Sequence, residues 1–170
     1  MKKLVFLLVA LLCFSCGISQ VLPDYKNYKL DTATDCQKAD TIVHQVANYL
    51  LQTPIKLSKS TNIEAAEYDK QRLDAASFLM KWMERTSEYS FSLDHSITKL
   101  DIELMSMYLA AMVKYSIENK NESEDLNIQK LNSWKILLEY CDNPTNNVEM
   151  SEKLKKLSDA NKKGELKAYM

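Results

Sequence analysis

Residues that interrupt helices are scarce in this chain, and this scarcity constrains the fold more than any other feature. Only two glycines and three prolines occur among the 170 residues. Tight hairpin turns and phosphate-binding loops depend on such residues, so the composition disfavours a many-stranded sheet. Apolar residues instead recur every three or four positions along most of the chain, which is the period of an amphipathic helix. The sequence therefore predicts an all-α protein.

Five segments carry this helical period. The first helix is predicted to begin at a capping box formed by Thr34 and Gln37, and to end before Pro54. The second is predicted to begin at a similar box, Thr61 with Glu64. The helices are predicted over residues 34–53, 61–85, 97–115, 123–140 and 148–161. Helices of these lengths favour an up-and-down bundle of four long helices plus a short C-terminal helix.

The N-terminal residues have the layout of a secretory signal. Two lysines at positions 2 and 3 precede an apolar run from Leu4 to Phe14, and small or polar residues follow. A membrane span needs about 20 apolar residues, and this run is little more than half as long. We therefore expect a signal peptide over 1–19, an extended leader over 20–33 and a single helical domain over 34–170. The product is expected to be exported, either periplasmic or secreted, with no transmembrane span.

Two routes of signal removal are compatible with the sequence. Gly17 and Ser19 occupy the −3 and −1 places of a small-x-small cleavage site, which would give a soluble product that begins at Gln20. The alternative is a lipid anchor at Cys16, because the residues around it resemble the end of a bacterial lipoprotein box. That box normally has an aliphatic residue where Cys13 stands, so we favour the soluble product.

Charge and composition argue against nucleic-acid binding. The chain has 22 basic and 23 acidic residues, and loss of Lys2 and Lys3 would take its net charge from −1 to −3. Apart from Arg72 and Arg85, the basic residues are lysines. Bidentate recognition of phosphate or guanine prefers arginine. We therefore expect no nucleic-acid partner.

The residues that usually bind metals or catalyse reactions do not form a recognisable set. His44 and His95 are the only histidines, and neither has a second histidine or a cysteine at ligand spacing. We expect a hydrogen-bonded, half-buried imidazole at His44, and expect Asp94 to cap the third helix beside His95. Di-metal bundles need a Glu-x-x-His motif, which this chain lacks. Acids near the helix starts, such as Asp101 and Glu103, are expected to be capping or solvated groups. We expect no cofactor and no metal.

One segment departs from the helical period. Tyr89, Phe91 and Leu93 alternate with Ser90 and Ser92, and this period of two predicts an extended segment with one apolar face. The first interpretation is a connector that covers the end of the bundle. The alternative is a binding lip, because functional residues concentrate on ordered loops.

Two cysteines are left in the predicted mature domain, Cys36 and Cys141. Thiols of an exported protein tend to pair where the compartment is oxidising. In an up-and-down bundle, the start of the first helix and the end of the fourth lie at the same end and on neighbouring helices. The sequence therefore predicts a disulfide between them, with two separate buried thiols as the alternative.

Three segments, 78–84, 131–133 and 140–144, resemble a family of small secreted helical bacterial proteins that has no known activity. The resemblance implies export and a compact fold, but no catalytic or binding residue. We expect an exported, non-enzymatic binding or interaction protein of the bacterial cell envelope, whose partner is a protein or a small ligand. The alternatives are an envelope enzyme without a recognisable motif and a structural or inhibitory protein.

Overall fold

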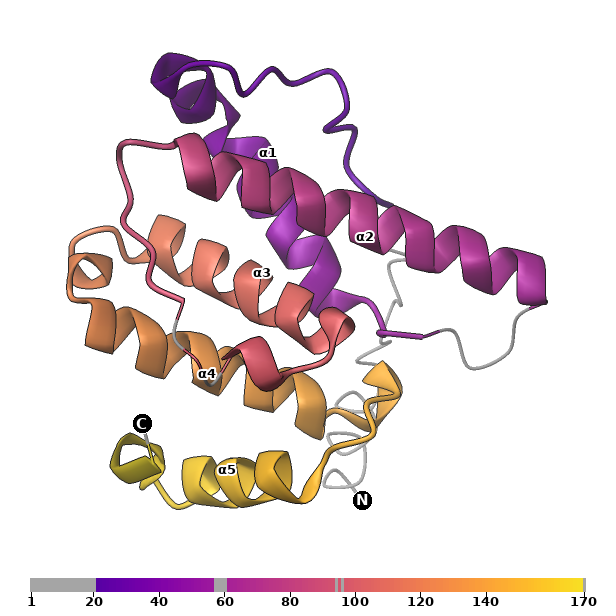
Figure 1. Ribbon diagram of the computed structural model, residues 1–170, viewed down its shortest axis with the longest axis vertical. Coiled ribbons are helices and arrows are strands. Elements are labelled where there is room, and N and C mark those ends of the chain that lie inside the picture. Colours follow the sequence, from indigo (N-terminus) through magenta and orange to yellow (C-terminus); the bar gives the residue numbers. More distant parts are fainter. Residues whose placement is uncertain (1–20, 57–60, 94, 96, 170) are drawn as a thin grey trace, which may run out of the picture.

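The computed structural model describes residues 21–56, 61–93, 95 and 97–169 (Figure 1). These residues form five α-helices and four short 3-10 helices, and no strand is found among them, so the all-α prediction is confirmed. The α-helices are α1 (Ala33–Gln52), α2 (Asn62–Arg85), α3 (Ile102–Glu118), α4 (Leu126–Asp142) and α5 (Glu152–Lys162). The predicted signal peptide and the alternative lipid anchor at Cys16 lie outside the described residues.

The helices begin where acidic or hydroxyl side chains cap them. The predicted box at α2 is confirmed, because the Thr61 hydroxyl accepts from the Glu64 N–H at 3.2 Å and the Thr61 N–H donates to the Glu64 carboxylate at 2.9 Å. The predicted box at Thr34 is wrong, since α1 is capped by Thr32 with Asp35. Both pairings have the same spacing, and an ionised carboxylate is a stronger acceptor than the amide of Gln37.

The third helix begins later than predicted. Residues 97–99 form a separate 3-10 turn, and the N-cap of α3 is Asp101, whose carboxylate accepts from the Leu104 N–H at 2.8 Å. Asp94, the expected cap, lies outside the described residues. Asp101 was expected to be a capping or solvated acid, and its capping role is confirmed.

The directions of the helices differ from the predicted up-and-down alternation. Arg72 of α2 contacts Met107 of α3 at 3.0 Å, while Glu88, just after α2, pairs with Lys120, just after α3. Arg72 precedes Glu88 along the chain, and their partners Met107 and Lys120 follow in the same order. The two helices α2 and α3 therefore run parallel (Figure 1). The connector between α2 and α3, of which residues 86–93, 95 and 97–101 are described, makes this possible by returning along the bundle. The central helix is α3, which packs against α1, α2 and α4, while α5 packs on α4.

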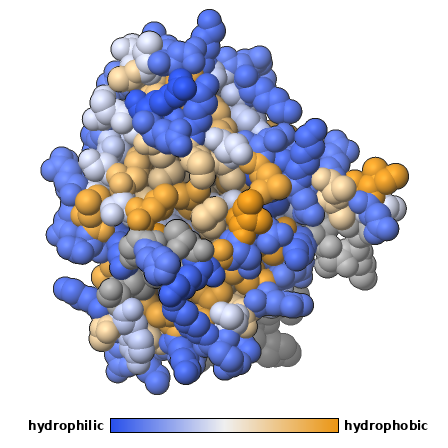
Figure 2. Space-filling view, viewed as in Figure 1, coloured by the Kyte–Doolittle hydropathy of each residue, from blue (hydrophilic) through white to orange (hydrophobic). Residues whose placement is uncertain are grey.

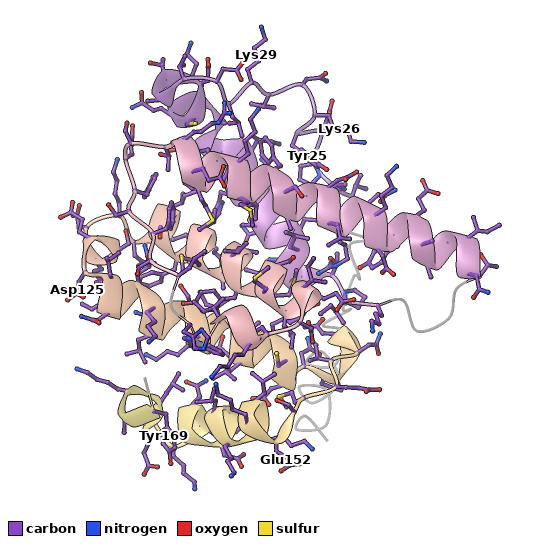
Figure 3. All side chains as sticks on the ribbon, in the orientation of Figure 1. Tyr25, Lys26, Lys29, Asp125, Glu152 and Tyr169 are labelled. Carbon is purple, nitrogen blue, oxygen red and sulfur yellow. The ribbon has the colours of Figure 1, made fainter. Side chains whose placement is uncertain are left out.

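The leader is part of the folded domain. Residues 21–32 form no helix, yet Tyr25 and Leu30 are buried among the core side chains. Tyr25 lies beside α2, with its ring centre 4.9 Å from that of Phe78 (Figure 3). Arg85 donates to the Leu30 carbonyl at 2.9 Å. These contacts hold the leader on the C-terminal half of α2.

The predicted disulfide is wrong: Cys36 and Cys141 are separate, buried thiols. The Cys36 carbonyl accepts from Trp82 at 3.1 Å near one end of the bundle. Cys141 follows Tyr140, whose hydroxyl donates to the Thr53 carbonyl at the other end of α1. The stretch of α1 from Cys36 to Thr53 spans about 25 Å at about 1.5 Å per residue. A disulfide needs Cα atoms within about 7 Å. Because α2 and α3 run parallel, α4 runs opposite to its predicted direction, and its C-terminal end lies far from the start of α1.

We expect thiol labelling of the denatured protein without reductant to detect both cysteines. In the native state labelling should be slow, because burial raises the pKa of the Cys36 thiol, and burial with the nearby Asp142 raises the pKa of Cys141 to about 12. Labelling requires the thiolate, which is then rare at neutral pH. Mass spectrometry of the labelled protein reads out both results. A denatured protein that takes up no label would contradict the arrangement of α1 and α4.

Candidate functional site: the groove between α2 and α3

The apolar residues of α2 do not all point into the core. Ile63, Leu73 and Met80 are among the large apolar residues of this helix, and such residues ordinarily face the core of a bundle. Their side chains are instead 80%, 40% and 40% exposed. The face that α2 buries includes Arg72 and Trp82. Leu73 and Met80, which are two turns apart on one side of α2, therefore leave a stripe of large hydrophobic side chains on the surface of the helix, and Ile63 lies apart from them near the start of α2.

A hollow lies beside this stripe, between α2 and the start of α3. Leu73 forms one side and Ile102, which is 58% exposed, belongs to the other. Figure 2 shows hydrophobic side chains gathered on this face of the molecule, with hydrophilic residues around them. We call the hollow the α2–α3 groove. It is lined by Ile55, Asp69, Arg72, Leu73, Ile102, Glu103, Ser106 and Met107.

Arg72 holds the inner part of the groove in place. It is only 5% exposed, and its Nη2 donates to the Leu50 carbonyl at 3.1 Å and to the Met107 sulfur at 3.0 Å. Its Nη1 donates to the hydroxyl of Thr53. Leu50 and Thr53 lie at the C-terminal end of α1, where carbonyls lack intrahelical partners and the helix dipole is negative. The guanidinium charge is thus offset by the end of α1.

The solvent side of the groove carries two acidic residues. Asp69 is exposed on α2, one turn before Leu73, and Glu103 is half-buried in the first turn of α3. Glu103 was expected to be a solvated or capping acid, and the structure places it at the groove. Nothing in the sequence marks Asp69, because an acid on an exposed helix face is ordinary. Arg72 offered a signal, because it interrupts an otherwise apolar helix face.

The predicted lip is divided by the structure. The segment is non-helical as predicted, but Tyr89 and Phe91 pack on Trp82 with ring centres 5.3 Å and 5.9 Å from it. These two rings are half-buried, which supports the covering-connector interpretation. Leu93 is 53% exposed. A lip function stays a prediction, and it now depends on Leu93.

The connector is anchored by a half-buried carboxylate. Asp40 of α1 accepts from Trp82 Nε1 at 3.2 Å and from the Tyr89 hydroxyl at 3.3 Å. Burial and the nearby Glu88 raise the pKa of Asp40. Burial and the charge of Asp40 raise the pKa of Tyr89 to about 12, so its phenol remains a donor. The Lys120 ammonium lies 5.2 Å from the centre of the Tyr89 ring, so Asp40, Trp82, Tyr89 and Lys120 form one cluster. Its contacts hold the connector on α1 and α2.

We expect Asp40→Asn to change the pH dependence of stability. Because the pKa of Asp40 is raised in the folded protein, its contribution is present below the unfolded pKa, about 4, and is lost as pH rises through the folded value. Asparagine keeps an oxygen acceptor without this loss. The free energy of unfolding of the variant, relative to wild type, should therefore rise between about pH 3 and neutrality. Urea denaturation at both pH values measures it, and a pH-independent difference would contradict the assignment.

The histidines show no arrangement for metal binding. His44 Nε2 lies 2.8 Å from the Glu118 carboxylate, so the prediction of a hydrogen-bonded, half-buried imidazole is confirmed. His95 is exposed on the connector. Among the described residues, no group of three or more histidines, cysteines and acids is placed to hold a metal ion. No helix in the described part of the chain is long and apolar enough to cross a membrane.

Comparison with known proteins adds no relative from which a role could be carried over. No protein-family model, curated protein or solved structure matches the chain. The functional argument therefore depends on the groove itself and on the residues that build it.

Proposed function

We propose that this is an exported, non-enzymatic binding protein of the bacterial cell envelope, and that it takes up a partner protein in the α2–α3 groove. The observation that carries the proposal is the apolar stripe of α2, in which Leu73, at the hollow, and Met80, two turns further along the helix, are each 40% exposed. Contiguous exposed hydrophobic surface is costly in a monomer and commonly marks an interaction site. Ile102, from the other wall, extends the same surface.

The construction of the groove supports this role. Its walls are helices of the core, and Arg72 ties its floor to the end of α1, so the surface exists before a partner arrives. Met80, two turns beyond Leu73 on α2, adds an exposed, flexible thioether side chain that can adapt to different partner residues. An apolar surface shared by two helices, with Leu73 on one side of the hollow and Ile102 on the other, suits the docking of a third helix.

Export is part of the proposal, and the N-terminal signal layout supports it. We expect the natural product to begin at Gln20, and intact-mass analysis of protein purified from its source decides this. A mass that includes a diacylglycerol group on Cys16 would replace the soluble product with the lipid-anchored alternative. A product that retains Met1 would contradict both routes.

Site-specific photo-crosslinking tests the binding role. A photoreactive residue at position 73 is expected to trap one defined partner in the cells that make the protein, identified by mass spectrometry. Ile102→Ser should remove the crosslink, whereas Ile63→Ser, on the same helix but outside the groove, should leave it. The matched control places the photoreactive residue at Ile128 of α4, which is also exposed. Equal products from positions 73 and 128, or none from position 73, would refute the groove as the binding site.

A further inference from the structure

We infer that the partner segment taken up by the α2–α3 groove is a basic amphipathic helix, with a lysine or arginine placed between Asp69 and Glu103. The inference rests on the proposed function, and it adds the chemistry of the partner. It is carried by the charges at the mouth of the groove and by the exposed apolar residues beside them.

The charge available to a partner is negative. Asp69 and Glu103 belong to opposite walls, α2 and α3, and both line the groove. Arg72 lies deeper, 5% exposed, with its guanidinium committed to the carbonyl of Leu50 and the hydroxyl of Thr53. Its positive charge offsets one of the two carboxylates, so two acidic side chains against one basic side chain leave the lining of the groove negative. A cationic side chain between them gains from both, and a carboxylate there is repelled.

The apolar residues fit the rest of an amphipathic helix. Leu73 and Met80 are seven residues apart, so they lie on one side of α2 and two turns along it. Ile102 faces the same groove from α3. A partner helix with apolar residues at positions i, i+3, i+4 and i+7 would match this length. The stem of its lysine or arginine would lie along Leu73 or Ile102 while the charged end reaches the acids.

Two other occupants fit less well. The lysine-rich helix of this chain, α5, buries Leu154 and Leu157, so a second copy has no free apolar face on that helix to insert. An anionic lipid surface would be repelled by Asp69 and Glu103 at the mouth. A basic helix from another protein avoids both difficulties.

The test uses the mature protein and two synthetic helical peptides of about 18 residues, a length that presents a full apolar face. Both have the same leucine face; one has lysines beside it and the other has glutamates. Fluorescence anisotropy is expected to show the lysine peptide binding about tenfold or more tightly than the glutamate peptide at low salt, with the difference shrinking as salt is added. Equal affinity of the two peptides would overturn the inference.

Charge variants locate the effect. Asp69→Asn with Glu103→Gln should weaken the lysine peptide about tenfold and abolish most of its salt dependence. Glu67→Gln with Asp74→Asn, which removes two acids from a different hollow on α2, should leave binding within about twofold. If both pairs have the same small effect, the acids do not select the partner.

Apolar variants separate this inference from the proposed function. One outcome is that the double variant Leu73→Ser with Ile102→Ser loses peptide binding while the charge variants have no effect. This result would support the groove as the binding site and reject a basic partner. Binding unchanged by either set would reject the groove as well. Failure of both peptides to bind wild-type protein also counts against both. Circular dichroism melting of each variant confirms that it is folded.

Discussion

Replacing Trp82 with alanine is expected to lower the free energy of unfolding by about 3–5 kcal/mol. Its side chain is fully buried and packs on the rings of Tyr89 and Phe91. Its indole N–H also donates to the Cys36 carbonyl and to Asp40. This one substitution opens a large cavity. It also removes the contacts that hold the start of α1 and the connector against the end of α2. Urea denaturation followed by far-ultraviolet circular dichroism gives the value.

Trp82→Phe is the matched control. It retains most of the ring volume and loses the N–H donor, so we expect a loss of about 1–2 kcal/mol. A loss of less than about 1 kcal/mol for the alanine variant would mean that Trp82 does not anchor the connector.

Replacing Arg72 with alanine is expected to cost about 3 kcal/mol. The guanidinium is buried and hydrogen-bonded to the Leu50 carbonyl and to Thr53, and its removal leaves these acceptors unsatisfied at the end of α1. The change should also open the floor of the α2–α3 groove, since Met107 loses its partner. Urea denaturation measures the stability, and hydrogen exchange of the last turn of α1 reports the local effect.

The other arginine of the chain gives the control. Arg85 is about half exposed, with Nη1 2.9 Å from the Leu30 carbonyl and 3.5 Å from Asp31. Exposed pairs of this kind contribute little, so we expect Arg85→Ala to cost less than about 1 kcal/mol. Equal losses in the two variants would show that burial of Arg72 is not what makes it important.

The candidate site could be predicted only in part, because a helical period does not say which neighbours a face will meet. The sequence of α2 places large apolar residues at Ile63, Leu73 and Met80, which a helical period alone would assign to the core. The structure leaves them at the surface, since α1 and α3 pack on the side that carries Arg72 and Trp82. A buried arginine is acceptable there because the end of α1 supplies its acceptors, and these lie far away in the sequence.

The sequence by itself determined the helices and much of their capping, because these depend on residues within one turn of each other. Thr61 and Glu64 satisfy each other's backbone donors whatever the rest of the chain does. The direction of the helices was decided only by the tertiary structure. Contacts between distant residues, such as Gln129 with the Ser90 carbonyl, hold the connector along the bundle and make α2 and α3 parallel. The same arrangement separates Cys36 from Cys141, because a bundle's topology depends on long-range packing that no local pattern records.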